Sequence, residues 1–93
     1  MYIFGCSGLN SIVIPNLVSE IEEYVFYKCS SLTNIIIPNS VTSIEKYAFE
    51  GCTRLKSVTI PKSVTSIGTN AFNRCFNLNE ETKQELRNRF YII

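Results

Sequence analysis

Residues 37–52 read IPNSVTSIEKYAFEGC, and residues 60–75 read IPKSVTSIGTNAFNRC. The second stretch begins 23 residues after the first, and the same interval separates the four cysteines, Cys6, Cys29, Cys52 and Cys75. A fixed period of this length is the signature of a tandem array in which each repeat forms one structural unit. The sequence therefore predicts about three stacked 23-residue turns.

Each period contains one predicted strand. In the first period Ile12 and Ile14 alternate with Ser11 and Val13, the period of two expected of a strand with one buried face. One turn cannot bury its own apolar side chains, whereas stacked turns place like residues over like and build a continuous core. Proline cannot donate to a ladder hydrogen bond, so we expect each strand to end at the proline that follows it: Pro15, Pro38 and Pro61.

The return path of each turn is too short and too irregular for a full helix. In the second turn Val41, Ile44 and Phe49 lie at spacings of three and five residues. We expect a second short extended segment there, followed by a helical turn near residues 47–50.

The cysteines are spaced unlike the clustered ligands of structural zinc, and the chain has no histidine. Neighbouring turns would lie about 4.8 Å apart, near the lower limit for a disulfide. Stacked side chains that point the same way would need an off-rotamer twist to form that bond. We therefore expect free, buried thiols that act as small hydrophobic residues.

The repeat fails after Leu78, where a different element begins. Asn79 can cap a helix that carries acidic residues in its first turn and arginines, Arg87 and Arg89, near its end. Leu86, Phe90 and Ile93 would form one apolar stripe over the last open turn. The predicted organisation is a repeat array over residues 1–78 and a C-terminal capping helix over residues 79–93.

Composition narrows the function. The chain has 93 residues, of which 45% are hydrophobic and 18% charged, the balance of a single folded unit. Its net charge of +1 gives no electrostatic reason to bind nucleic acid or an anionic membrane, and no apolar run is long enough to span a bilayer. The absence of His and Asp removes the usual nucleophile, general-base and metal-ligand arrangements. We expect neither enzymatic activity nor a metal or other cofactor.

The motif I-P-x-S-V-T-S-I-x-x-x-A-F-x-x-C resembles the BspA-like, or Treponema-type, leucine-rich repeat over about residues 3–78. The resemblance implies a β-rich α/β solenoid, a right-handed leucine-rich repeat array with a C-terminal capping helix. It also implies a cell-surface or secreted protein, linked with adhesion to host cells or matrix proteins, and it brings no catalytic residues. The first repeat departs from the motif at Leu17, Glu20 and Val25, and residues 1–10 lack the features of a signal peptide.

The strand face opposite the core is the one regular surface predicted for recognition. Its outward side chains would form two rows across the strands: Ser11, Asn34 and Ser57, and next to them Val13, Ile36 and Thr59. Two interpretations stay open. The apolar members of these rows reflect the preference of strands for β-branched residues, or they form a shallow contact stripe for a protein partner.

A second expectation concerns the first turn, which has no preceding cap in the sequence. Residues 1–23 carry a net charge of −3, while each later stretch is positive. Such asymmetry favours head-to-tail association into a homo-oligomer, with a structural or scaffolding role as the alternative function. The side chains expected to be exposed for that contact are Ile12, Ile14, Val18 and Ile21.

Overall fold

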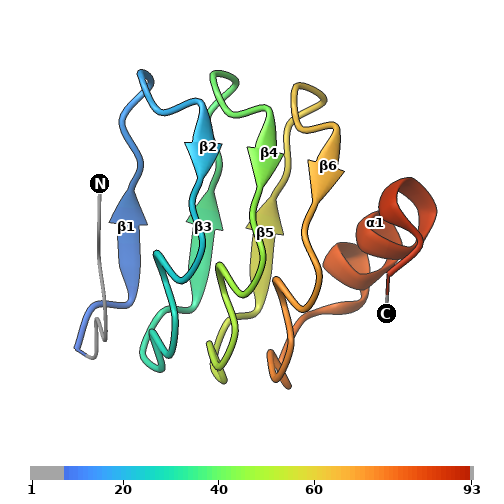
Figure 1. Cartoon of the computed structure of the whole chain (residues 1–93). Coiled ribbons are helices and arrows are strands. Elements are labelled where there is room, and N and C mark those ends of the chain that lie inside the picture. The colour runs from blue at the N-terminus through green and yellow to red at the C-terminus, as the bar shows by residue number, and fades with distance from the viewer. Residues whose placement is uncertain (1–7, 93) are drawn as a thin grey trace.

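The structure is a computed structural model and describes residues 8–92. Three turns of chain stand side by side, and a helix lies beside the last of them (Figure 1). The described elements are, in order, β1 (Ser11–Val13), β2 (Glu20–Ile21), β3 (Asn34–Ile36), β4 (Ser43–Ile44), β5 (Ser57–Thr59), β6 (Ser66–Ile67) and α1 (Glu80–Phe90).

The strands form two parallel sheets, one ordered β1-β3-β5 and the other β2-β4-β6. In the first sheet Ile12 pairs with Ile35, and Ile35 pairs with Val58, so each residue lies beside its counterpart in the next repeat. The second sheet keeps the same register. The predicted stack of parallel turns is confirmed, while the right-handed path of the coil stays a prediction.

The core consists of like residues stacked on like. Ile14, Ile37 and Ile60 are 4%, 2% and 7% exposed, which confirms the predicted isoleucine row. The rings of Phe26, Phe49 and Phe72 stack in a second row, with centroids 5.0 and 5.1 Å apart. Because each row runs through all three turns, the apolar surface of one turn is buried by its neighbours.

The return path differs from the prediction. The extended segment is present as β4, but the helical turn expected near residues 47–50 is wrong. Tyr47 and Gly51 have left-handed backbone angles, with φ of 60° and 80°, and such residues interrupt a right-handed helix. The chain instead makes successive tight turns, and these leave the Phe49 N–H free to donate to the Ala71 carbonyl of the next turn at 2.7 Å.

The cysteines are only partly as expected. Cys52 and Cys75 are free and buried, and their Sγ atoms donate to the carbonyls of Phe26 and Phe49 at 3.1 and 3.2 Å. Cys29 is disulfide-bonded, so the expectation of a free thiol is wrong there. Cys6 lies outside the described residues.

Helix α1 begins as predicted. The Asn79 side chain accepts from the Thr82 N–H at 2.9 Å, which caps the helix, and Leu86 is fully buried against the last turn. The Thr82 hydroxyl in turn accepts from the Val58 N–H of β5 at 3.2 Å, a contact absent from the sequence prediction. The helix ends at Phe90 rather than extending to residue 93, because Tyr91 adopts a left-handed cap with φ of 58°. Ile93 lies outside the described residues.

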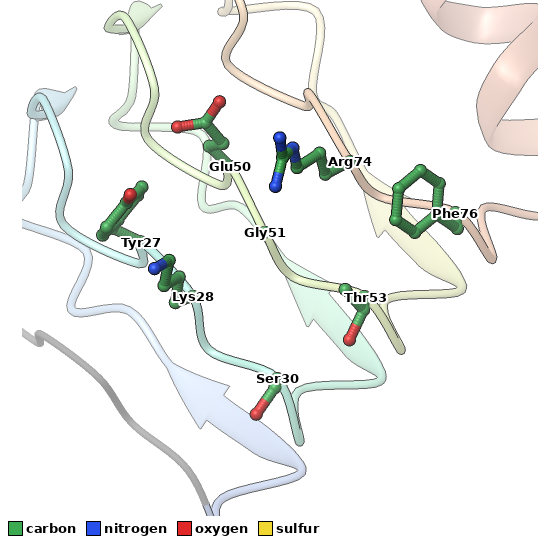
Figure 2. A pocket seen from close by; sticks show the side chains of 8 residues that line it. All are labelled: Tyr27, Lys28, Ser30, Glu50, Gly51, Thr53, Arg74 and Phe76. Carbon is green, nitrogen blue, oxygen red and sulfur yellow. The ribbon is translucent and has the colours of Figure 1, made fainter.

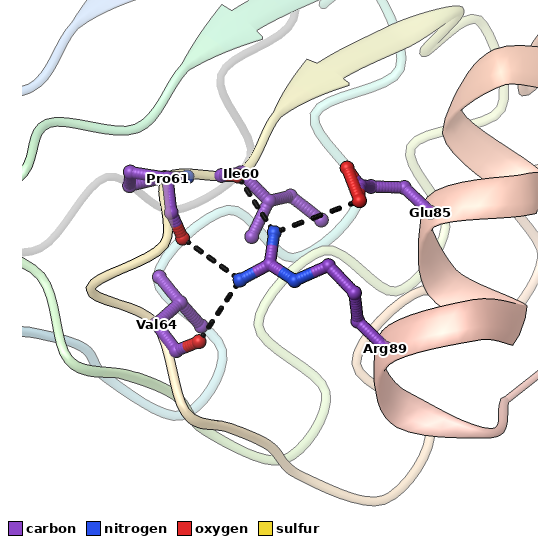
Figure 3. A network of polar contacts seen from close by, with 5 residues as sticks. All are labelled: Ile60, Pro61, Val64, Glu85 and Arg89. Carbon is purple, nitrogen blue, oxygen red and sulfur yellow. Dashed lines mark hydrogen bonds and ion pairs between the residues drawn. The ribbon is translucent and has the colours of Figure 1, made fainter.

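Arg89 ties the helix to the last turn (Figure 3). Its guanidinium donates to the carbonyls of Ile60, Pro61 and Val64 at 2.8, 3.0 and 3.1 Å. The carboxylate of Glu85 lies 3.8 Å from the same guanidinium. These contacts give the carbonyl groups of the last turn hydrogen-bond donors from the helix.

Candidate functional site

The first sheet brings all six predicted contact residues onto one surface, here called the strand face. Its register places Ser11, Asn34 and Ser57 in one row and Val13, Ile36 and Thr59 in the next. The predicted arrangement is confirmed, while its role in binding remains a prediction.

The apolar part of the strand face lies over β1 and β3. Val13 and Ile36 are 91% and 70% exposed, although neighbouring Ile35 is buried. A shallow groove of about 440 Å³ follows these two strands and is bordered by Asn16 and Pro38. Large apolar side chains that are exposed beside one another and rimmed by polar groups are a feature of interaction surfaces.

The polar row is held in place by its own hydrogen bonds. The Ser57 hydroxyl donates to Asn34 Oδ1 at 2.6 Å, and Asn34 Nδ2 donates to the Thr33 hydroxyl at 3.2 Å. Neither row contains a charged residue, so contact with a partner would require no desolvation of an ionised group from these rows.

A second surface feature was not predicted from the sequence. It is a groove of about 560 Å³ at the corner of the turns, here called the corner groove, lined by Tyr27, Lys28, Ser30, Glu50, Gly51, Thr53, Arg74 and Phe76. In Figure 2 the Arg74 side chain lies over the chain near Gly51, with the exposed Phe76 ring beside it. Lys28 lies at the other end, with its Nζ 5.3 Å from the centre of the Tyr27 ring. The groove combines charges of both signs, hydroxyl groups and an aromatic wall, which suits recognition more than catalysis.

One position of the sequence repeat could have indicated the corner groove. Positions 28, 51 and 74 are equivalent and hold Lys, Gly and Arg, while most core positions keep one residue type. All three positions have a left-handed backbone, with φ of 57°, 80° and 64°, which favours glycine at the centre. That glycine leaves a gap between the two cations.

Tyrosines extend the aromatic surface next to the corner groove. The rings of Tyr24 and Tyr47 stack with centroids 5.2 Å apart, which confirms the stacking expected of equivalent residues in adjacent turns. Desolvation raises the pKa of Tyr24, and the neighbouring Tyr47 raises it further. Both tyrosines therefore belong to the packing of the corner.

The first turn differs from the expectation of an open apolar end. Ile14 and Ile21 are buried, so the expected exposure of these two side chains is wrong, and Ile12 and Val18 are half-buried. Self-association through this turn remains a prediction that would depend on Ile12 and Val18.

Over residues 8–92, no cluster of three or more potential metal ligands is found. Helix α1 is neither long nor apolar enough to cross a membrane, and no other helix in the described part of the chain meets that criterion.

Comparisons with known proteins agree with this architecture. A crystal structure of a Treponema pallidum leucine-rich repeat protein aligns with a TM-score of 0.58 and 29% identity, covering 92% of this chain and 51% of the other. A leucine-rich repeat protein from Bacteroides ovatus aligns with a TM-score of 0.54 and 29% identity, covering 81% of this chain and 31% of the other. The chain thus spans about half of the first protein and a third of the second. No curated protein matches the chain significantly.

A family profile described as "BspA type Leucine rich repeat region (6 copies)" matches residues 1–89. Repeat proteins of this kind are generally non-enzymatic protein-interaction folds, and the family is typically surface-associated. The match covers nearly the whole chain, so the chain belongs to the BspA-type leucine-rich repeat family.

Proposed function

We propose that this chain is a non-enzymatic module that binds a protein partner through the strand face. The proposed role is adhesion or recognition of a host-cell or matrix protein, with the protein exposed at the cell surface or secreted. The right-handed solenoid is the arrangement in which we expect the repeats to present this face.

The main observation in favour of this proposal is the exposure of Val13 and Ile36. Both side chains lie in the shallow groove over β1 and β3, where core packing does not require them. Fully burying one such side chain is worth roughly 1.5–3 kcal/mol. Asn34 and Ser57 supply hydrogen-bonding groups beside this apolar pair, as expected of a small interface with an apolar centre and a polar rim.

The test is binding of the labelled chain to cultured host cells and to immobilised matrix proteins. The double variant Val13→Ser and Ile36→Thr should weaken binding at least tenfold, because it removes the exposed apolar pair and keeps the strands. The matched control is Tyr91→Ser, which removes an exposed aromatic side chain beyond the end of α1. Equal binding by the double variant and the control would reject the strand face as the contact surface.

The alternative role, a scaffold that assembles through its first turn, has one supporting observation. Among the described strands, β1 and β2 are each paired on one side only, and parallel edges of this kind can accept a further strand. The acidic residues Glu20, Glu22 and Glu23 lie at this end of the array. Head-to-tail assembly should weaken with added salt in sedimentation experiments, whereas a chain that stays monomeric at high micromolar concentration would contradict this role.

A further inference from the structure

The corner that follows β6 in the last turn differs from the equivalent corners of the earlier turns in its hydrogen bonds. In the interior of the array, alternate backbone N–H groups at this corner donate to carbonyls of the next turn. Three such bonds join the second turn to the third: Tyr47 to Thr69 at 3.3 Å, Phe49 to Ala71 at 2.7 Å, and Gly51 to Asn73 at 2.9 Å. Each turn therefore offers a row of donors that the carbonyls of alternate residues can satisfy.

The equivalent donors of the last turn have no acceptor. They belong to Asn70, Phe72 and Arg74, 23 residues after their counterparts, and their N–H groups find no hydrogen-bond partner within residues 8–92. Helix α1 covers a different part of this end, because Thr82 meets Val58 of β5. In Figure 1 the corner after β6 extends past the helix.

A groove of about 680 Å³, here called the end groove, lies over these three donors. Phe72 and Leu78 are buried beneath it, and half-buried Ile92 forms part of its wall. Its charged lining residues are Arg74 and Lys83, and no acidic residue lines it. Neither cation forms an ion pair within the described part of the chain. The end groove thus combines a row of backbone donors with two unpaired positive charges.

We propose that the end groove binds an acidic peptide segment of a partner protein. Main-chain carbonyls of the segment would accept from Asn70, Phe72 and Arg74, as the next turn does in the interior of the array. Acidic side chains would pair with Arg74 and Lys83. A small anion would fit less well, because donors on alternate residues are spread along the chain and match the repeat of a peptide. This surface is separate from the strand face.

The experiment uses the whole chain labelled with ¹⁵N and a peptide of about eight residues in which glutamate and threonine alternate. Binding should shift the amide resonances of Asn70, Phe72 and Arg74 and slow their hydrogen exchange. The double variant Arg74→Gln and Lys83→Gln should bind about five- to tenfold more weakly, the effect of losing two exposed ion pairs. Lys28→Gln is the matched control, because Lys28 is the counterpart of Arg74 in the first turn and does not line the end groove.

Three results would overturn the proposal. The first is equal binding of a peptide in which lysine replaces glutamate. The second is peptide binding that leaves the three amides unaffected. The third is protection of the same amides in the chain alone as its concentration rises, which would make a second copy the occupant. None of these results bears on binding at the strand face, so the two proposals fail independently.

Discussion

The guanidinium of Arg89 donates to the carbonyl oxygen of Ile60 at 2.8 Å, and so joins the capping helix to the point where β5 ends. The second terminal nitrogen of the same group donates to the carbonyls of Pro61 and Val64. A planar group with several donors can satisfy three carbonyls at once, which a single ammonium group cannot do with the same geometry. Arg89 thus supplies three donors to the last turn, where the Pro61 carbonyl also accepts from the Val64 N–H at 3.1 Å.

Replacing Arg89 with alanine should therefore destabilise the chain by about 1.5–3 kcal/mol, since hydrogen bonds to a charged group are lost and carbonyls are left without their donor. Arg87→Ala is the matched control. Its guanidinium contacts Glu80 at 2.6 Å, but the pair is exposed and worth about 0–1 kcal/mol. Urea unfolding followed by circular dichroism measures both free energies. Equal losses of unfolding free energy in the two variants would contradict the proposed role of Arg89.

Ile36 and Ile37 are adjacent residues, one exposed and one buried, so substituting each tests which face of the chain points into the core. Ile37→Ala should cost about 2–5 kcal/mol because it opens a cavity in the middle of the core, an amount that could unfold a chain of this size. Ile36→Ala changes the adjacent residue, which is 70% exposed, and should alter the free energy of unfolding by less than about 0.5 kcal/mol. A larger drop in the thermal midpoint for Ile36→Ala than for Ile37→Ala would mean that the assigned inward and outward faces are reversed, and equal drops would contradict the assignment.

At Gly68 the backbones of two turns approach so closely that a side chain would collide with the neighbouring turn. A Cβ atom added there would lie 2.5 Å from the backbone nitrogen of Lys46 and 2.8 Å from the carbonyl carbon of Glu45, in the preceding turn. These atoms belong to the paired backbone and cannot move cheaply, so Gly68→Ala should destabilise the chain by about 1–3 kcal/mol. Thr69→Ala, at the exposed neighbouring position, is the control for urea unfolding. A stabilising effect of Gly68→Ala would show that the turns can separate at this point.

The sequence predicted those features that follow from its period or from short-range chemistry. Equivalent positions 23 residues apart were enough to pair Ile12 with Ile35 and to place Val13 and Ile36 on the outer surface. The Asn79 cap was also predictable, because the side chain and the N–H that it accepts from are three residues apart.

Features that depend on three-dimensional approach were not predictable in this way. The left-handed backbone of Tyr47 has no sequence signature comparable to glycine, so the sequence alone predicts a helical turn where the chain makes tight turns. The contacts of Thr82 and Arg89 join residues at least 24 positions apart and lie outside the repeat. The disulfide of Cys29 breaks the equivalence of the cysteine positions, which periodicity alone treats as identical.

The buried thiols of Cys52 and Cys75, here called the cysteine row, predict how the free energy of unfolding depends on pH. Contact between the Cys52 and Cys75 thiols, together with burial, raises the pKa of Cys75 well above its ordinary value of 9.0, and the same contact lowers the pKa of Cys52. Below that value both the folded and the unfolded chain keep the proton, so the contribution of this thiol to stability is fully present. Above it the unfolded chain releases the proton while the folded chain retains it. The free energy of unfolding should then fall by up to about 1.4 kcal/mol per pH unit.

Urea unfolding between pH 8 and pH 10.5, without reductant and read before the free thiolates exchange with the disulfide of Cys29, measures this slope. Cys75→Ala should be less stable at every pH, because it leaves a small cavity, but its stability should decline less steeply above pH 9. All other ionisable groups are shared by the two proteins, and Cys75→Ala also removes the contact that lowers the pKa of Cys52, so the difference between the two slopes reports the Cys52–Cys75 pair. Parallel slopes would mean that the Cys75 thiol ionises as readily in the folded chain as in the unfolded one, and that the cysteine row is open to solvent.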